Sequence, residues 1–147
     1  MSLSIEQRLD ILESREQIKE ARARYGWHAV RGEIHEVAWL YTEDGIFQVG
    51  SNRVQGRDAI VGFLAASGMK PVKVVPLIHN DIIVIEGDTA HGTCAMENPG
   101  TPDSPNGFTG YYLDKLRRVN GQWLFSKRKI YNEQVAELAA PPGNPSW

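Results

Sequence analysis

The stretch that decides the fold runs from Val72 to His91 and reads V-K-V-V-P-L-I-H-N-D-I-I-V-I-E-G-D-T-A-H. Its apolar run, Ile82 to Ile85, is followed by the polar turn Glu86-Gly87-Asp88. An apolar run bounded by such a turn is typical of a strand, and the hydrophobic period is close to two throughout. The pattern therefore predicts one strand over residues 72–86 and a second over residues 89–97.

Two further strands are expected downstream. Residues 108–119 and 122–132 are joined by Asn120-Gly121, the dipeptide that most strongly signals a short hairpin turn. The loop at residues 98–107 is rich in proline and glycine and too long for a tight turn, which makes it a candidate lid. Residues 133–147 have too few apolar groups for a core and are predicted to form an extended tail.

Upstream of these strands, apolar residues recur with helical spacing. Ser4 and Gln7 form a capping box, and no proline precedes Arg31-Gly32, so one long helix is expected. A short helix follows and ends at a turn, Thr42–Gly45. After this turn we expect a hairpin at residues 46–49 and 53–55 and a third helix from Gly56 to Gly68. Two apolar stripes run along the long helix, and the second should face the core. The first stripe consists of Ile5, Leu9, Leu12, Ala23 and Trp27, and the second of Ile11, Ile18, Ala21, Tyr25 and His28.

The composition fits one domain with a core of ordinary size. The chain has 147 residues, a formal net charge of -2 and 23% charged residues, so no basic surplus indicates nucleic acid as a partner. No segment approaches the roughly 20 apolar residues of a membrane span, and the start lacks a signal-peptide core. We expect a cytoplasmic protein with its domain at residues 1–132. The single cysteine, Cys94, is expected to be a buried thiol rather than a nucleophile.

Three helices followed by four long antiparallel strands indicate an α+β fold. A long, twisted sheet with helices on one face curls into a cone-shaped barrel. The space that such a cone encloses is the expected pocket for a small molecule.

The same order of elements resembles a known family over residues 8–132. The phrases that carry the resemblance are Ala23-Arg24-Tyr25, Arg31-Gly32-Glu33, Leu40 to Phe47, Gly56 to Leu64, Ile83 to Ala90 and Val119 to Ile130. In this order and spacing the chain resembles the SnoaL-like branch of the NTF2-like superfamily, which implies the cone-shaped fold. That superfamily includes dehydratases, isomerases, cyclases, dehydrochlorinases and non-catalytic subunits, so the resemblance does not select a reaction.

Dehydratase-like members of the family, scytalone dehydratase among them, use an Asp–His dyad as a general base. The carboxylate fixes the imidazole tautomer, and the ring takes a proton near neutral pH. The resemblance places the Asp position at Val30 and the His position at Pro76, or at Val75 or Leu77 if the register shifts, and none of these residues can move a proton. A pocket-lining arginine of the family's last strand matches Arg128. The resemblance therefore implies a cone in which the usual proton-transfer pair is lost or relocated.

Two histidines are candidates for a substitute base. His79 precedes Asp81 by two residues, a spacing that would place both on one strand face, where the carboxylate could orient the ring. Alternatively, the two residues satisfy each other or face a neighbouring subunit. His28 lies one turn beyond Tyr25 on the inward stripe, so Tyr25 could be its hydrogen-bonding partner. The alternative is a histidine satisfied at the helix C-terminus, with Tyr25 in the core.

Arg128 lies between apolar neighbours in the last strand, where a guanidinium needs an anionic or carbonyl partner. It could bind an oxygen or a carboxylate of the substrate, or it could pair with Asp114 on the neighbouring strand. Asp81, Tyr41 and Tyr112 complete the candidate substrate-binding residues. No zinc site is expected, because the four histidines lack the paired spacing of zinc ligands.

Two functions are compatible with these residues. The first is binding of a mostly apolar, cyclic or aromatic metabolite, with cofactor-free proton transfer of the dehydratase (lyase) or isomerase kind. The second is a non-catalytic binding or assembly role. Neither needs a cofactor. The tail at residues 133–147 is expected to pack across a neighbouring subunit or over the cone mouth, in a homodimer or homotrimer.

Overall fold

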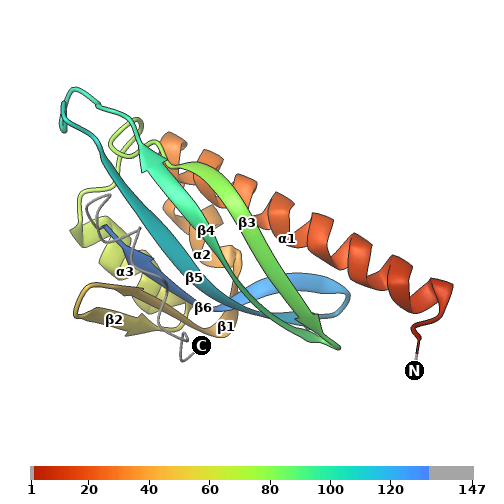
Figure 1. The fold of residues 1–147 in the computed structure, drawn as a ribbon. Helices are drawn as coiled ribbons and strands as arrows, with labels where there is room; N and C mark the ends of the chain where they lie inside the picture. Colours follow the sequence, from red (N-terminus) through yellow and green to blue (C-terminus); the bar gives the residue numbers. More distant parts are fainter. Residues whose placement is uncertain (1, 133–147) are drawn as a thin grey trace.

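The structure is a computed structural model that describes residues 2–132. The predicted tail lies outside the described residues, and its packing on a neighbouring subunit stays a prediction. Within residues 2–132, three helices and six strands follow one another (Figure 1). Their bounds are α1 (Ile5–Arg31), α2 (Ile34–Trp39), β1 (Tyr41–Val49), β2 (Asn52–Gln55), α3 (Arg57–Ala66), β3 (Leu77–Glu86), β4 (Thr89–Asn98), β5 (Phe108–Val119) and β6 (Gln122–Tyr131).

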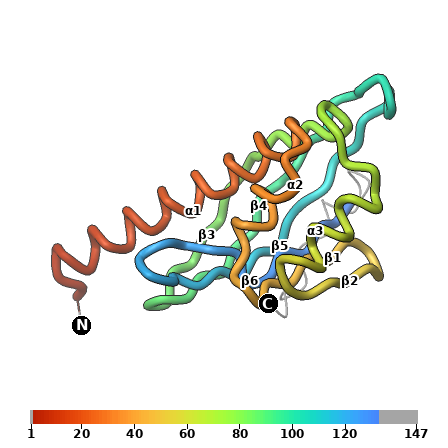
Figure 2. Tube along the Cα trace, turned by 180° about the vertical axis from the view of Figure 1, so that it is seen from behind, coloured from red at the N-terminus to blue at the C-terminus, as the bar shows by residue number. Residues whose placement is uncertain are grey.

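The strands form one sheet in the order β2-β1-β6-β5-β4-β3. All neighbouring strands are antiparallel except β1 and β6, which run parallel. The β5–β6 turn has positive φ at both Asn120 and Gly121, 50° and 77°, as a two-residue hairpin of the predicted type requires. Seen from behind, the three helices cover one face of the sheet (Figure 2). The predicted α+β class is confirmed.

Helix α1 begins and ends where the sequence predicts. The Ser4 hydroxyl accepts a hydrogen bond from the Gln7 backbone at 3.1 Å, and the Gln7 side chain accepts one from the Ser4 backbone at 2.9 Å. The helix ends at Gly32, whose φ of 70° is the left-handed conformation of a helix C-cap. None of the helices in residues 2–132 is long and apolar enough to cross a membrane.

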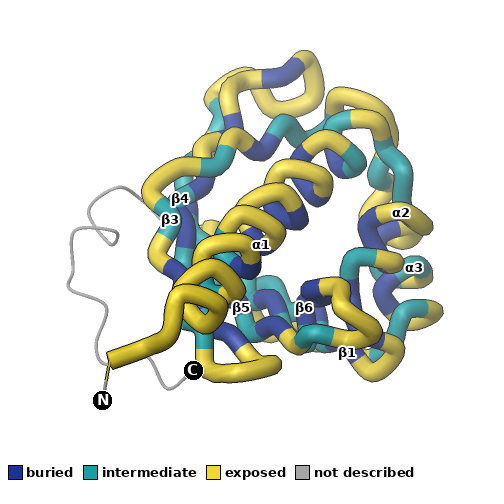
Figure 3. Tube along the Cα trace, turned by 90° about the vertical axis from the view of Figure 1, so that its right-hand side faces the viewer, coloured by how far each residue is buried: buried dark blue, intermediate teal, exposed yellow. Residues whose placement is uncertain are grey.

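Only the second apolar stripe of α1 faces the core. Ile18 and Tyr25 on that stripe are buried, whereas Ile5 and Trp27 on the first are 76% and 62% exposed. Figure 1 shows the first turns of α1 extending beyond the sheet, and Figure 3 shows that they are exposed all round. A helix longer than the sheet that supports it leaves its outer turns without a surface on which to bury apolar groups.

Two strands start at places that differ from the prediction. Strand β3 begins at Leu77 and not at Val72, because Val72 has a φ of 59° and its N–H donates to the carbonyl of Val30 at 2.7 Å. Pro76 has no N–H to contribute to a ladder. Strand β1 already begins at Tyr41, so the predicted turn at Thr42–Gly45 is wrong. The irregular part of β1 is a shift in the register of its pairing with β6, between Tyr41 and Ile46.

A β-bulge in β3 reverses the predicted orientation of the polar cluster. β3 has one more residue between His79 and Ile82 than β4 has opposite them, and Asn80 has a φ of 56°. The extra residue changes the alternation, so that Asp81 lies on the inner face with Ile83 while His79 stays exposed. The prediction that His79 and Asp81 share a face is therefore wrong.

Candidate functional site

A cavity of about 320 Å³ lies between the helices and the inner face of the sheet. Its walls come from α1, α3, the segment between α3 and β3, and strands β1, β4, β5 and β6. Most lining side chains are apolar, and they include Ala29, Phe47, Phe63, Met69, Phe108 and Ile130. The polar lining residues are Tyr25, Ser67, Lys73, Asn98, Tyr112 and Asn132. The largely apolar pocket predicted for the cone is therefore present, and it is partly open to solvent.

Two side chains that line this cavity donate hydrogen bonds to the same sulfur atom. The Tyr112 hydroxyl donates to Met96 Sδ at 3.2 Å, and the Asn98 amide donates to the same atom at 3.5 Å. The Asn98 side chain is held in place because its amide oxygen accepts a hydrogen bond from the Val75 N–H at 2.7 Å. All three side chains at this point, Tyr112, Asn98 and Met96, are at least nine-tenths buried. A thioether is a weak acceptor, so both donors have capacity for a stronger one.

The tyrosine hydroxyls at the cavity are neutral donors. The Tyr25 and Tyr112 rings meet edge to face, 5.9 Å apart. Burial raises the pKa of Tyr25, and it raises the pKa of Tyr112 well above its ordinary value. Both hydroxyls therefore keep their protons at neutral pH. The Tyr112 hydroxyl, which reaches Met96 Sδ, can donate to an oxygen of a ligand, whereas the Tyr25 hydroxyl faces Tyr41 in the core.

A buried ion network lies behind these two rings. Arg128 donates from Nε and Nη2 to the two oxygens of Asp114, at 2.7 and 3.0 Å. Arg22 donates from Nε to Asp114 at 3.0 Å and from Nη1 to Asp81 at 2.6 Å. Arg22, Arg128 and Asp114 are at most 1% exposed. The two arginines and two aspartates balance in charge, which is the arrangement that buried ions need.

Arg128 contacts aromatic faces as well as its carboxylate partner. Its guanidinium carbon lies 3.9 Å from the Tyr112 ring centre, 4.4 Å from Tyr25 and 4.3 Å from Phe125. Burial alone would lower the pKa of Arg128, but the attraction of Asp114 and the hydrogen bonds to it raise the pKa overall. Of the two roles open to Arg128 in the sequence, the structure shows the pairing with Asp114. The arginine does not line the cavity.

The structure brings only Tyr25 and Tyr112 of the predicted site residues to the cavity. His28 lies at the C-terminal end of α1, with Nδ1 2.5 Å from the Glu33 carboxylate. His79 is half-exposed on β3 and lies 3.4 Å from Glu97.

Asp81 forms an ion pair with Arg22. The remaining predicted residue, Tyr41, is buried in the core, and its ring centre lies 5.7 Å from that of Phe125. Burial raises the pKa of Tyr41 well above its ordinary value. Pro76, which the resemblance places at the histidine position of the dehydratase-like enzymes, does line the cavity. Within residues 2–132, no group of three His, Cys, Asp or Glu side chains is placed to hold a metal ion.

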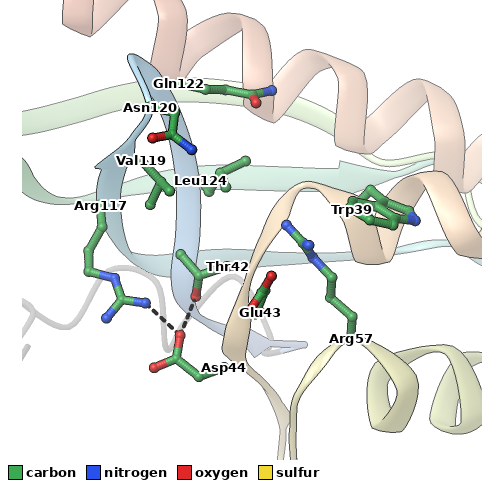
Figure 4. Close-up of a pocket in the computed structure, with 10 residues that line it drawn as sticks. All are labelled: Trp39, Thr42, Glu43, Asp44, Arg57, Arg117, Val119, Asn120, Gln122 and Leu124. Atoms are coloured by element: carbon green, nitrogen blue, oxygen red, sulfur yellow. Dashed lines mark hydrogen bonds and ion pairs between the residues drawn. The ribbon is translucent and has the colours of Figure 1, made fainter.

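A second, more open depression of about 680 Å³ lies outside the cone, beside the start of β1 and the β5–β6 hairpin (Figure 4). Three of its charged side chains, Asp44, Arg57 and Arg117, are already engaged by neighbouring groups of the protein. Arg117 and the Thr42 hydroxyl both donate to Asp44. The Arg57 guanidinium lies over the Trp39 ring, 4.2 Å from the ring centre, and donates two hydrogen bonds to the backbone carbonyl of Tyr41. These contacts secure β1, and the cavity of the cone remains the better candidate for a ligand.

Several solved structures have the same architecture as this chain. An NTF2-like protein with a cystatin-like fold from Novosphingobium aromaticivorans is 24% identical, with a TM-score of 0.76, over 91% of this chain and 93% of that chain. A variant of Rv3472, a protein of unknown function from Mycobacterium tuberculosis, is 24% identical, with a TM-score of 0.73, over 92% and 84% of the two chains. LinA is 17% identical, with a TM-score of 0.73, over 84% and 88%. At these identities the likeness shows the fold alone.

A search of curated proteins by sequence finds no match. Residues 10–129, however, match the SnoaL-like domain, and this range includes α1 from its second turn onward, the whole conical sheet except its last residues, and most of the cavity. With the fold and the cavity in agreement, the chain belongs to the SnoaL-like family.

Proposed function

We propose that the chain binds a small, mostly apolar, cyclic or aromatic molecule that carries an oxygen acceptor. The observation that carries this proposal is the pair of buried donors, Tyr112 and Asn98, that meet on the weak acceptor Met96 Sδ. A carbonyl or hydroxyl oxygen in the cavity would give both donors a better partner. The volume of about 320 Å³ equals that of about ten water molecules, which suits a compound of one or two rings.

Binding without chemistry is the function that the cavity supports best. Of the residues that the structure describes, those that line the cavity include no carboxylate and no imidazole. Abstraction of a proton from carbon needs a base within hydrogen-bond reach of that proton, directly or through one water. His28 and His79 lie elsewhere and interact with Glu33 and Glu97. A cavity that offers donors and no base suits recognition of a neutral or acceptor-rich ligand.

Cofactor-free dehydration or isomerisation is a second candidate, supported by the neutral donors Tyr112 and Asn98 and by the positive charge of Arg128 behind the Tyr112 ring. Such donors stabilise negative charge that develops on a carbonyl oxygen. Under this function the base would come from water or from the substrate, unless His28 or His79 reaches the cavity by a rearrangement. Turnover assays on His28→Ala and His79→Ala variants would reveal whether either histidine takes part.

Filling the cavity is expected to abolish binding. Ala29 lines the cavity on α1, so Ala29→Leu places a larger side chain in the space that a ligand needs. In a thermal-shift titration, 2-naphthamide should raise the Tm of the native protein but not that of Ala29→Leu. The matched control is Ala23→Leu on the exposed side of the same helix, which should respond like the native protein.

Tyr112→Phe removes one donor and should weaken binding of the same amide about threefold to tenfold, as the loss of a neutral hydrogen bond does. Circular dichroism shows whether each variant is folded. An Ala29→Leu protein that is folded and still binds 2-naphthamide with native affinity would place the ligand outside this cavity and contradict the proposal.

A further inference from the structure

We propose that the ligand of this cavity is an anion, a cyclic or aromatic carboxylate whose carboxylate group pairs with Lys73. The inference rests on the proposed function, because it adds a charged group to the molecule that the cavity binds. It starts from the charge of the lining residues. Among the residues of the described range 2–132 that line the cavity, Lys73 is the one with a formal charge at neutral pH, and the others are apolar or neutral.

The ammonium group of Lys73 has no counter-ion within residues 2–132. It donates one hydrogen bond, to the carbonyl oxygen of Ser67 just beyond the end of α3. Lys70, three residues earlier, differs because it forms an ion pair with Asp103 at 2.9 Å. An ammonium carries three donors, so the contact with Ser67 leaves two available for an acceptor in the cavity.

The backbone holds Lys73 at this position at a conformational cost. The preceding residue, Val72, has a φ of 59°, a left-handed conformation that a β-branched residue rarely adopts. Two tertiary contacts maintain it, since Val72 donates to the Val30 carbonyl and the Val75 N–H donates to the Asn98 side chain. Backbone conformations of this kind cluster at ligand sites, where surrounding structure maintains them. The segment is thus tied both to α1 and to Asn98, one of the cavity's two donors.

A carboxylate suits this arrangement better than a second cation or a neutral group. The Lys73 ammonium lies at the solvent-exposed edge of the cavity, where an ammonium and a carboxylate still attract each other, though less than they would in the apolar interior. A hydrogen bond between charged groups is about twice as strong as one between neutral groups. The ring system of the ligand would occupy the apolar part of the cavity, and its carboxylate would lie within reach of Lys73.

Two probes of the same shape test the charge. Fluorescence titration should give a Kd for 2-naphthoate at least about tenfold lower than that for neutral 2-naphthamide. In Lys73→Met, which keeps the length of the side chain and removes its charge, the ratio of the two Kd values should fall to about one. Lys70→Met is the matched control, and it should keep the native ratio because Lys70 does not line the cavity.

The outcomes separate this inference from the function on which it rests. Equal affinity of the native protein for the two probes, or an unchanged ratio in a folded Lys73→Met, would overturn the role of Lys73 and leave the cavity as a binding site for neutral molecules. If neither probe binds, or if Ala29→Leu binds both with native affinity, the proposed function fails and the inference fails with it.

Discussion

Asp114→Asn is expected to lower the free energy of unfolding by about 3–5 kcal/mol, the usual cost of breaking a buried ion pair. Asp114 accepts hydrogen bonds from Arg22 and Arg128, all three being at most 1% exposed. Its neutral replacement leaves two guanidinium groups with Asp81 as the one remaining carboxylate partner. Small domains have stabilities of about 5–15 kcal/mol, so the variant should be marginally folded, with a urea midpoint far below that of the native protein.

Asp88→Asn is the matched control for this experiment. Asp88 also pairs with an arginine, Arg118, at 2.9 Å, but its side chain is 78% exposed. Exposed ion pairs contribute little to stability, so the urea midpoint of this variant should stay close to the native value. A native-like midpoint for Asp114→Asn would mean that the two arginines do not depend on this carboxylate.

The protein is expected to lose stability steeply as the pH rises above 9. Burial raises the pKa of Cys94 from its ordinary value of 9.0 to about 12, and burial also raises the pKa values of three tyrosines: Tyr25, Tyr41 and Tyr112. Between pH 9 and 12 the unfolded chain releases protons that the folded chain keeps. The unfolded state then binds fewer protons, so stability falls as the pH rises. For Cys94 alone, a shift of about three pH units corresponds to about 4 kcal/mol by pH 12.

Urea unfolding at a series of pH values measures this slope, and Cys94→Ala isolates the thiol. The variant should be less stable than the native protein at pH 7, because it loses packing in the core, yet its stability should fall less between pH 9 and 12. If the two proteins show the same slope, the thiol does not ionise differently in the folded and unfolded chains.

Local sequence signals predicted those parts of the fold that local chemistry decides. The capping box at Ser4 and the glycine at position 32 gave both ends of α1, and Asn120-Gly121 gave the turn between β5 and β6. Where a distant contact decides the backbone, the same reasoning fails. The residues from Val72 to Pro76 have the composition of a strand, but the Val30 carbonyl and the Asn98 side chain bind their N–H groups and keep them out of the sheet.

The site was predicted only in part for the same reason. Tyr25 was identified from its place on the inward face of α1, and the pairing of Arg128 with Asp114 follows from the register of a hairpin that the sequence identifies. Met96 and Lys73 carry no local signal, since the roles of these two residues and of Asn98 arise where β4 meets the segment that precedes β3. The one available hint was Asn98 itself, a polar residue at the end of a strand and directly before a proline.

The bulge in β3 also bears on how chemistry is gained or lost in a cone of this kind. One unmatched residue, Asn80, is the reason that the strand presents Asp81 to the interior and His79 to solvent. Inserting a single residue into β4 opposite Asn80 would restore regular pairing with β3 and move the irregularity to the pairing of β4 with β5, which is regular now. Strict alternation outward from Ile83 would then direct the His79 imidazole inward. The place of one unmatched residue can therefore decide, without any substitution, which side chains of a strand face the interior of the cone.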